Sequence, residues 1–276
     1  MQKRIWITWE TQRRSVELAK KFGCDLYIIE HKGIMRYPSS IFKTIFILYR
    51  GKPDVLFVQN PSMILAALAC ICRIIFKYFL VVDRHTTFLL DKEHRNSPWQ
   101  ILFRFLSEKT IQYSDITIVT NSLLAEMVKS LRGHPYILPD MIPVLQETRR
   151  EKLKGRYNIL MVSSFAADEP IQEVLEALGA FAKDEVYLYV TGNYKKLDER
   201  VRNTAPYNVV FTGFLDEQDY VNMLFSCDAT MVLTTASACM LCGCYEAISV
   251  EKPLITSDKD VLKEYFTDAV FVDNTA

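Results

Sequence analysis

The chain has 276 residues, of which 50% are hydrophobic and 24% charged, a composition that is typical of folded globular proteins and excludes a disordered or low-complexity chain. Its seven cysteines are odd in number and lie mostly in apolar runs, which argues against a disulfide-rich secreted domain. The formal net charge is zero, but residues 1–150 hold 22 Lys and Arg against 13 Asp and Glu, and the remainder hold 11 against 20, so the halves carry +9 and −9.

The positive first half suits an anionic partner, such as a phospholipid surface or a phosphorylated substrate, or it reflects attraction between two domains of opposite charge. The N-terminus, Met1–Glu10, is too short in its apolar part for a secretion signal and leads directly into a first strand. The longest apolar run, Met63–Cys72, has about half of the ~20 residues that cross a bilayer. We therefore expect a cytoplasmic protein without a transmembrane helix.

Short apolar runs alternate with helical patterns along the first half. The runs predict strands at Ile5–Thr8, Leu26–Ile29, Val55–Gln59, Leu80–Asp83, Ile116–Thr120 and Tyr136–Leu138. The spacing of apolar residues predicts helices at Arg13–Phe22, Ser40–Arg50, Met63–Tyr78, Pro98–Tyr113 and Ser122–Leu131. Strands that are apolar throughout and separated by helices indicate a parallel sheet covered on both faces.

A polar stretch, Gln146–Arg156, interrupts this alternation, which then begins again. The second set of strands is predicted at Tyr157–Ser163, Val186–Thr191, Asn208–Phe211, Ala229–Leu233, Pro253–Thr256 and Ala269–Val272. The helices between them are Glu169–Ala182, Lys195–Asn203, Glu217–Cys227, Gly243–Val250 and Asp260–Phe266. We expect an α/β protein of two tandem doubly wound, Rossmann-like domains, residues 1–145 and 146–276, with the site beyond the carboxyl ends of the strands in the cleft between them.

One segment of the second half, Met240–Asp258, has the composition of a phosphate and ribose site. Small residues around Gly243 lead into a short helix, so an anion can approach the N–H groups at the helix start. Glu246 lies one turn further on, where a carboxylate can accept hydrogen bonds from sugar hydroxyls. Because an exposed helix start contributes only about 0.3–1 kcal/mol toward an anion, a cation should assist, and Lys195 and Lys196 are the candidates.

Several short motifs give the chain a family resemblance. Leu160–Phe165 opens the second domain, Val-Phe-Thr-Gly-Phe follows at Val210–Phe214, and Tyr-Glu-Ala with Lys-Pro lies within Tyr245–Pro253. Together with two tandem doubly wound domains, these motifs resemble glycosyltransferases of the GT-B fold, particularly family 4. The Phe-x-x-Asp-Glu-Pro loop at Phe165–Pro170 and the Met-Leu-Cys-Gly segment at Met240–Gly243 are similar to a bacterial subgroup involved in surface polysaccharides.

The resemblance implies that the second domain binds a nucleotide-diphosphate sugar. Glu246 would accept hydrogen bonds from the ribose, and the N–H groups around Gly243 would face the diphosphate. The other residues implied at this donor site are Cys242, Cys244, Tyr245, Thr212, Gly213, Phe214, Gly192, Asn193, Lys195 and Ser164. If the sugar is transferred with retention of configuration, as in family 4, no dedicated base is required.

The chain departs from the family pattern in three respects. A second glutamate usually lies eight positions before Glu246, where this chain has Ala238. The loop Ser163–Pro170 contains two acidic residues and none of the usual Arg and Lys. The chain also ends at Ala276, just past a predicted strand, where relatives continue through further helices, so we expect a fragment or an abbreviated terminus.

The first domain is expected to bind the acceptor. Glu10, Arg13 and Arg14 follow its first strand, and paired arginines suit either a phosphate or a solvated helix start. Asp83 and His85 follow its fourth strand, where His85 could orient or deprotonate an acceptor hydroxyl, and Asp83 could set its tautomer or act as the base itself. A histidine at a strand end is also often a satisfied polar cap, so both interpretations of His85 stay open.

Peripheral contact with an anionic membrane, on the inner face of the cell membrane, is a further expectation. Ser40–Arg50 and Pro98–Tyr113 combine aromatic and aliphatic residues with cations, as helices that lie among lipid headgroups do. The alternative is that each helix packs its apolar stripe on the sheet.

Other site classes find little support. Asp258-Lys259-Asp260 lies between a strand and a helix, where Asp is an ordinary N-cap rather than a metal ligand. Cys239, Cys242 and Cys244 form a cluster, but zinc would need a further ligand and the second half has no histidine. Because the chain lacks dinucleotide, P-loop and Gly-x-Ser-x-Gly motifs, we expect no hydride transfer and no NTP or serine hydrolysis. Neither a metal, a cofactor nor nucleic acid is expected to bind.

The sequence thus predicts a metal-independent, hexosyltransferase-type glycosyltransferase. It would move a sugar from a nucleotide-diphosphate sugar to a saccharide or polyprenyl-linked saccharide in surface glycan biosynthesis. Two alternatives stay open. One is a non-catalytic GT-B relative that acts as a binding or partner subunit, and the other is a nucleotide-sugar epimerase, which would need acid and base groups around the donor sugar.

Overall fold

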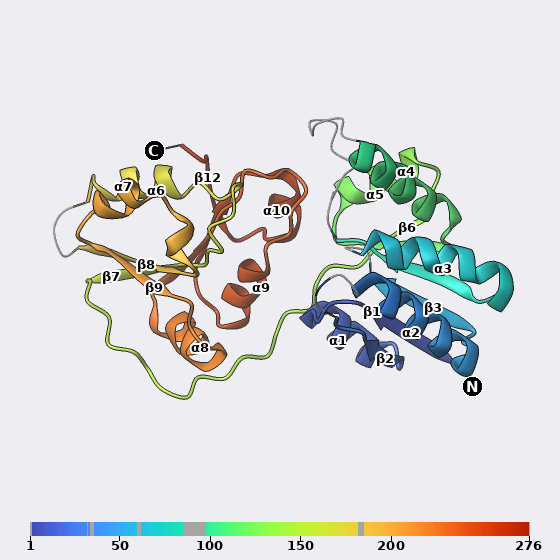
Figure 1. Cartoon of the computed structure of the whole chain (residues 1–276). Helices are drawn as coiled ribbons and strands as arrows, with labels where there is room; N and C mark the ends of the chain where they lie inside the picture. Colours follow the sequence, from blue (N-terminus) through green and yellow to red (C-terminus); the bar gives the residue numbers. More distant parts are fainter. Residues whose placement is uncertain are drawn as a thin grey trace. The chain divides into compact units, whose positions relative to one another are not determined.

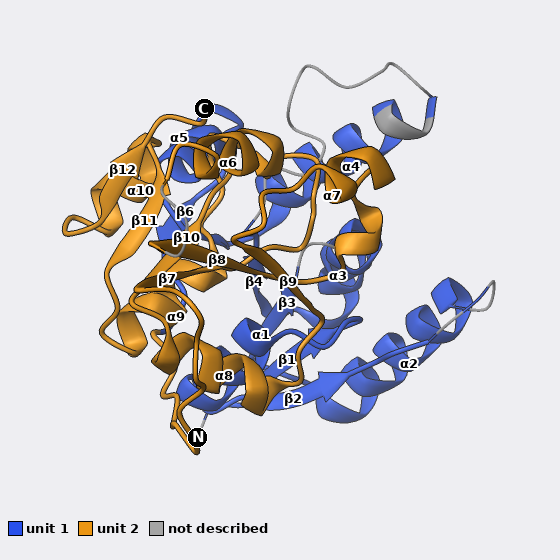
Figure 2. Ribbon diagram, turned by 90° about the vertical axis from the view of Figure 1, so that its left-hand side faces the viewer, with its two compact units in different colours: residues 1–141 blue, residues 142–276 orange. Residues whose placement is uncertain are grey.

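The computed structural model describes residues 2–31, 33, 36–59, 62–85, 98–181 and 185–275. The chain divides into two compact units, Met1–Met141 and Ile142–Ala276, each built around its own parallel sheet (Figures 1 and 2). The prediction of an α/β chain with two tandem Rossmann-like domains is therefore confirmed. Among the residues described, no helix is long and apolar enough to cross a membrane.

The first unit contains a six-stranded sheet in the order β2-β1-β3-β4-β5-β6, with every pairing parallel. Its strands are β1 (Arg4–Thr8), β2 (Asp25–Ile28), β3 (Val55–Gln59), β4 (Phe79–Asp83), β5 (Ile116–Val119) and β6 (Pro135–Ile137). Its helices are α1 (Arg13–Lys21), α2 (Arg36–Gly51), α3 (Met63–Phe76), α4 (Pro98–Tyr113) and α5 (Ser122–Ser130). All five predicted helices are present, and α2 is longer than its prediction.

Alternate residues of these strands enter two different cores, because successive side chains of a strand point to opposite faces of the sheet. Ile5 and Ile7 of β1 pack on one face with residues of α2 and α3. Trp6 lies on the other face with residues of α1, and its ring stacks on Phe57 at 5.1 Å between centroids. Both faces of the sheet are covered, which explains why the strands have no polar alternation.

The second unit contains another parallel six-stranded sheet, in the order β12-β11-β10-β7-β8-β9. Its strands are β7 (Tyr157–Met161), β8 (Val186–Thr191), β9 (Val209–Gly213), β10 (Ala229–Val232), β11 (Leu254–Ser257) and β12 (Val270–Val272). Its helices are α6 (Ile171–Leu178), the 3₁₀ turn η1 (Tyr194–Lys196), α7 (Glu199–Asn203), α8 (Glu217–Ser226), α9 (Cys242–Ser249) and α10 (Asp260–Tyr265).

The order of the strands determines where each sheet can bind a ligand. In the second unit the chain proceeds outward from β7 to β9, then returns to β10 on the other side of β7 and proceeds outward again. The connections therefore leave β7 and β10 in opposite directions, and the region beyond their carboxyl ends, which we call the crevice, is where a sheet of this order is expected to bind a ligand. The first unit has its corresponding reversal between β1 and β3.

Two helix predictions in the second unit were wrong in their bounds. The helix expected at Glu169–Ala182 spans only Ile171–Leu178, because the side chain of Glu169 turns back to the preceding loop; residue 182 lies outside the described part. The helix expected at Lys195–Asn203 is divided into η1 and α7, and Asp198 begins the second piece by accepting a hydrogen bond from Arg200 N at 2.7 Å.

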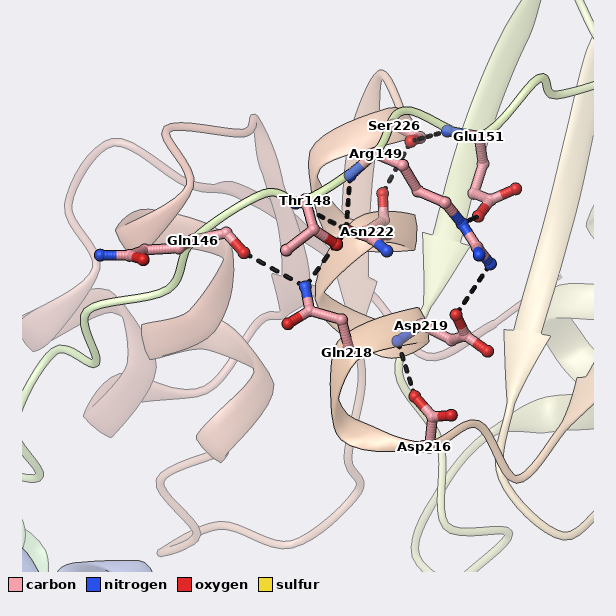
Figure 3. Close-up of polar contacts among 9 residues, drawn as sticks. All are labelled: Gln146, Thr148, Arg149, Glu151, Asp216, Gln218, Asp219, Asn222 and Ser226. Atoms are coloured by element: carbon pink, nitrogen blue, oxygen red, sulfur yellow. Dashed lines mark hydrogen bonds and ion pairs between the residues drawn. The ribbon is translucent and has the colours of Figure 1, made fainter.

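The polar stretch before β7 is attached to the second unit by hydrogen bonds to α8 (Figure 3). The buried Asn222 accepts hydrogen bonds through Oδ1 from the backbone N–H groups of Thr148, at 3.0 Å, and Arg149, at 3.2 Å. One turn further on, Ser226 Oγ accepts a hydrogen bond from Glu151 N at 2.7 Å. Residues 146–151 are therefore an edge of the second unit and not a free linker.

Candidate functional site

The start of α9 lies against the two strands that border the crevice of the second unit. A Cβ atom added to Gly243 would lie 3.1 Å from side-chain atoms of Val162 and Val232, so the helix start packs closely against the ends of β7 and β10. The N-cap residue, Leu241, makes no side-chain capping hydrogen bond. The positive end of the helix is therefore directed at the crevice, where an anion is favoured.

Glu246 lies one turn into α9 and is held in place by a neighbouring helix. Its Oε2 atom accepts a hydrogen bond of 2.5 Å from the hydroxyl of Tyr220 on α8. Burial, and then the charge of Glu246, raise the pKa of Tyr220 far above its ordinary value, so the hydroxyl stays protonated and donates. The half-buried carboxylate is thus oriented by a neutral donor. Sequence reasoning missed Tyr220 because only the packing of α8 on α9 brings it near.

The loops after β8 and β9 approach each other and the loop after β7 through glycine. Gly192 has a φ of +95°, and its N–H donates to the carbonyl of Gly213 at 2.9 Å. A Cβ atom at Gly192 would lie 2.1 Å from the carbonyl oxygen of Ser163, a distance that no side chain tolerates. The predicted glycines therefore bring three strand ends together at this edge of the sheet.

The polar side chains predicted beside these glycines are used differently from the prediction. Asn193 accepts a hydrogen bond from Lys195 N at 3.2 Å and so begins η1. The Thr212 hydroxyl lies 3.2 Å from the carbonyl of Val190. Phe214, by contrast, is 89% exposed directly after β9. An exposed aromatic ring at a strand end can stack on a planar ligand.

The loop after β7 directs several N–H and O–H groups at one point, where the carboxylate of Glu169 accepts hydrogen bonds from them. Glu169 accepts hydrogen bonds from Ser164 N at 3.0 Å, Ser164 Oγ at 2.7 Å, Phe165 N at 2.9 Å and Ser163 Oγ at 2.5 Å. Ser164, predicted at the donor site, therefore has both donors engaged within the loop. Lys196 Nζ donates to the carbonyl of Ser164 at 2.8 Å. The loop that lacks the Arg and Lys of the family pattern thus holds a carboxylate that accepts from its own donors.

The same loop is bonded to the far side of the crevice. Asp168 Oδ2 accepts a hydrogen bond from the Thr234 hydroxyl at 2.6 Å, and its carbonyl accepts one from Thr235 N at 2.6 Å. Thr234 and Thr235 follow β10, so these bonds join the two loops that the strand order separates. Two hydrogen bonds therefore connect the loop after β7 to the loop after β10.

Two residues of the predicted donor site turn their side chains into the core. Tyr245 is 2% exposed and its ring packs on Tyr265 and Phe266 at 5.3 and 5.1 Å between centroids. Cys244 is fully buried, its N–H donates to the carbonyl of Leu241 at 3.0 Å, and burial raises the pKa of its thiol to about 12. Neither side chain reaches the crevice, and the N–H of Cys244 is bonded within the turn. For Cys242 and Gly243, contact with a diphosphate stays a prediction.

The cysteine cluster provides no metal site in the described structure. All seven cysteines are free thiols, and no three His, Cys, Asp or Glu side chains of the described ranges are grouped closely enough to hold a metal ion.

In the first unit, Arg14 is buried and saturated by protein acceptors. Its guanidinium donates to Asp83 at 2.9 Å, to Asp140 at 2.5 Å and to the carbonyl of Leu138 at 2.9 Å. The arginine predicted to bind a phosphate therefore joins α1 to the ends of β4 and β6. Arg13, its predicted partner, is exposed and pairs with Glu17 one turn on at 2.9 Å, while Glu10 pairs with Arg36 at 2.6 Å.

Asp83 is also excluded from contact with a substrate. It has no exposed surface, and although burial alone would raise its pKa, contact with His85 and the charge of Arg14 hold the pKa below its ordinary value. A carboxylate that is ionised and enclosed is a poor proton acceptor, so the prediction of Asp83 as a catalytic base was wrong. His85 Nδ1 lies 3.6 Å from Asp83 Oδ2, and its side chain is 18% exposed. Asp83 can orient His85, which is the part of the prediction that the geometry permits.

Comparison with known proteins finds a family similarity in the second unit. Residues 146–275 match the family model described as "Glycosyl transferases group 1". No sequence among curated proteins matches the chain. The match covers β7 to β12, with the α9 start, Glu246 and the glycine loops described above.

Solved structures of similar fold cover nearly the whole chain. HepE of Anabaena, crystallised with UDP-glucose, is 12% identical over 98% of this chain and 85% of its own, with a TM-score of 0.70. Sucrose-phosphate synthase from Thermosynechococcus elongatus is 11% identical over 100% and 87%, also with a TM-score of 0.70. UDP-GlcNAc 2-epimerase from Methanocaldococcus jannaschii is 12% identical over 99% and 89%, with a TM-score of 0.58. At such identities the likeness concerns the fold, which is the two-domain GT-B fold.

Proposed function

Because residues 146–275 match the family model of the group 1 glycosyl transferases, we propose that this protein transfers a sugar from a nucleotide-diphosphate sugar to a saccharide or lipid-linked saccharide. The second unit would bind the donor and the first unit the acceptor. In the reaction, the acceptor hydroxyl oxygen would bond to the anomeric carbon as the bond from that carbon to the diphosphate breaks, and the hydroxyl proton would pass to the departing nucleoside diphosphate.

The observation that carries the proposal is the hydrogen bond that orients Glu246 one turn into a helix whose start lies against the ends of β7 and β10. The N–H groups at Cys242 and Gly243 suit the diphosphate, and Glu246, held by Tyr220, suits the ribose hydroxyls. The exposed ring of Phe214 suits the base, by stacking. Lys195, on η1 after β8, would supply a cation. With a helix start and a lysine to balance the charge, the transfer would need no metal ion.

HepE, a protein of the same fold, was crystallised with UDP-glucose, which supports a nucleotide-sugar donor here.

The acceptor is the second part of the proposal. For the acceptor we propose a saccharide on a polyprenyl carrier in surface glycan biosynthesis, used on the cytoplasmic face of the cell membrane. His85, oriented by Asp83, would align the acceptor hydroxyl.

The test is donor binding and turnover by the purified chain. Calorimetric titration with UDP-, GDP- and dTDP-sugars should reveal one preferred donor, and adding acceptor should release the nucleoside diphosphate. Glu246→Gln should lower donor affinity at least about tenfold, because a carboxylate that accepts from hydroxyls is lost. Glu176→Gln, at an exposed carboxylate of α6, is the matched control and should leave affinity unchanged. Equal affinities of the two variants would contradict the role of Glu246.

The second candidate is a non-catalytic relative, and the carboxylate of Glu169 favours it. Glu169 accepts hydrogen bonds from the N–H groups of the loop after β7. Ala238 stands where the family usually has its second glutamate. A chain that binds the donor without releasing nucleoside diphosphate, or that binds no nucleotide sugar at all, would support this candidate over the enzyme.

The third candidate is an epimerase, which the fold of the M. jannaschii enzyme keeps open. It differs from a transferase in its products, because the sugar stays on the nucleotide. Chromatography of the nucleotide sugar after incubation without acceptor would reveal an isomer if the epimerase candidate were right, and unchanged donor if the chain is a transferase.

A further inference from the structure

Helix α2 exposes a stripe of large apolar residues to solvent. Phe42, Ile45, Phe46 and Tyr49 recur at the spacing of one helix face and are 73%, 40%, 52% and 64% exposed. The side of α2 that packs on the protein buries Leu48 together with the polar Ser40 and Thr44. A surface helix normally has polar residues on its outer face, so packing on the sheet does not explain this stripe.

The two following helices also expose large apolar residues. On α3, Ile71, Ile74 and Ile75 are 63%, 79% and 73% exposed, and on α4 Ile101, Leu102 and Phe105 are exposed. Helix α4 buries Ile111 together with the polar Ser107 and Thr110. Because α3 packs against both α2 and α4, the three stripes belong to one layer of the first unit (Figure 1). We name the ten exposed residues of these stripes the helical face.

A groove opens between α3 and α4 on this layer. It has a volume of about 600 Å³ and is lined mainly by apolar residues, among them Ile71, Ile74 and Leu106. Arg73 and Lys109 also line it, and the Lys109 ammonium lies 5.6 Å from the centre of the Phe105 ring. Apolar depth with cations beside it suits a hydrocarbon chain that ends in an anionic group.

The charge around the helical face has one dominant sign. The three helices contain six Lys and Arg, namely Arg36, Lys43, Arg50, Arg73, Arg104 and Lys109, and a single acidic residue, Glu108. Arg36 is paired with Glu10 and Arg73 with Asp115, so the excess of positive charge comes from the other four. Arg50 lies over the ring of Phe46 at 5.5 Å, so a cation and an aromatic ring occur together at this surface, as they do among lipid headgroups. Ten exposed apolar residues on three neighbouring helices indicate an interaction site.

We propose that the helical face docks on an anionic phospholipid bilayer, with α2, α3 and α4 lying in the headgroup region and their isoleucine and aromatic side chains entering the acyl layer. The charges complement anionic headgroups, and none of these helices is long and apolar enough to span the bilayer. Docking deepens the proposed function, since it would bring the first unit to a lipid-linked acceptor, but the contact is independent of donor chemistry.

The test is flotation of the full-length protein with liposomes in the absence of nucleotide sugar. The protein should float with vesicles of phosphatidylcholine and phosphatidylglycerol and much less with phosphatidylcholine alone. The double variant Ile74→Glu/Ile75→Glu should reduce the bound fraction at least about tenfold, because two exposed apolar side chains become anionic. Val144→Glu, at a residue that is 89% exposed outside the helical face, is the matched control and should bind as the unchanged protein does.

Circular dichroism of each variant verifies folding, which the high exposure of the replaced residues should preserve. Three results would overturn the proposal: no binding of the unchanged protein to anionic vesicles, equal binding of the double variant, or a dimer in light scattering that the double variant converts to a monomer. The last result would assign the helical face to a second copy of the chain. Because no donor is present, failure of docking would leave the proposed transfer reaction to its own test.

Discussion

The carboxyl ends of the two sheets use charged residues in opposite ways. In the first unit, Arg14 and Asp83 are buried and satisfy each other, together with Asp140. In the second unit, Glu246 stays half-buried, oriented by the Tyr220 hydroxyl. An enclosed ion pair is part of the framework, whereas a partly exposed carboxylate retains oxygen lone pairs for a ligand. Residue type at a strand end therefore does not identify a site until burial and partners are known.

The strongest test of this comparison is removal of the buried cation. Arg14→Ala would leave Asp83 and Asp140 without their partner, and we expect the free energy of unfolding to fall by about 3–5 kcal/mol. Arg13→Ala, at the adjacent exposed pair with Glu17, should cost no more than about 0.5 kcal/mol. Urea unfolding curves of the two variants measure both effects, and equal losses would show that Arg14 is not the structural member of the pair.

The glycine loops of the second unit are the next test. Gly192→Ala should cost about 3 kcal/mol, because a positive φ and a contact of 2.1 Å with the Ser163 carbonyl act together. Gly23→Ala shares the positive φ but has open space around its Cβ position, so about 1 kcal/mol is expected. Thermal and urea unfolding would reveal the difference. Similar losses would mean that the loops after β7 and β8 can separate.

Acid titration sharpens the role of Asp83. Because the native state lowers its pKa, Asp83 stabilises the fold above its unfolded pKa, near 3.8, and this contribution is lost as the pH falls through the lower native value. The stability difference between the unchanged protein and Asp83→Asn should therefore be greatest near neutral pH and shrink below about pH 4. Urea unfolding at a series of pH values measures it, and a difference that is constant with pH would contradict the ionised state of Asp83.

The smallest expected effect concerns the residue that orients Glu246. Tyr220→Phe removes one hydrogen bond to the carboxylate, so nucleotide-sugar affinity should fall about three- to tenfold, the equivalent of about 1 kcal/mol. Tyr157→Phe, at the amino end of β7, is the control and should bind normally. Calorimetry resolves such a change. An unaltered affinity of Tyr220→Phe would contradict the role of this hydrogen bond in donor binding.

Much of the fold was predictable because it depends on local patterns. Apolar runs without polar alternation indicated buried parallel strands, and α4 has the predicted bounds, Pro98–Tyr113. The prediction for α6 failed where a side chain bonded outside its own helix, since Glu169 serves the preceding loop. Of the site, the glycines and the position of Glu246 at the start of α9 follow from local spacing. Sequence reasoning missed Tyr220 and Asp140, because they come from segments distant in the sequence. It also missed the role of Glu169, whose spacing indicated a helix although its side chain bonds to the preceding loop.

From the sequence by itself came the number and type of elements, the two domains and the helix start with its carboxylate, because these depend on neighbours within a few residues. The tertiary structure alone decided which charges are enclosed, which N–H groups are already satisfied and which helix faces meet solvent. Arg14 and the stripe of α2 illustrate the difference. Their spacing permits either a buried or an exposed position, and only the packing of distant segments, with the desolvation of each charge that follows, selects one.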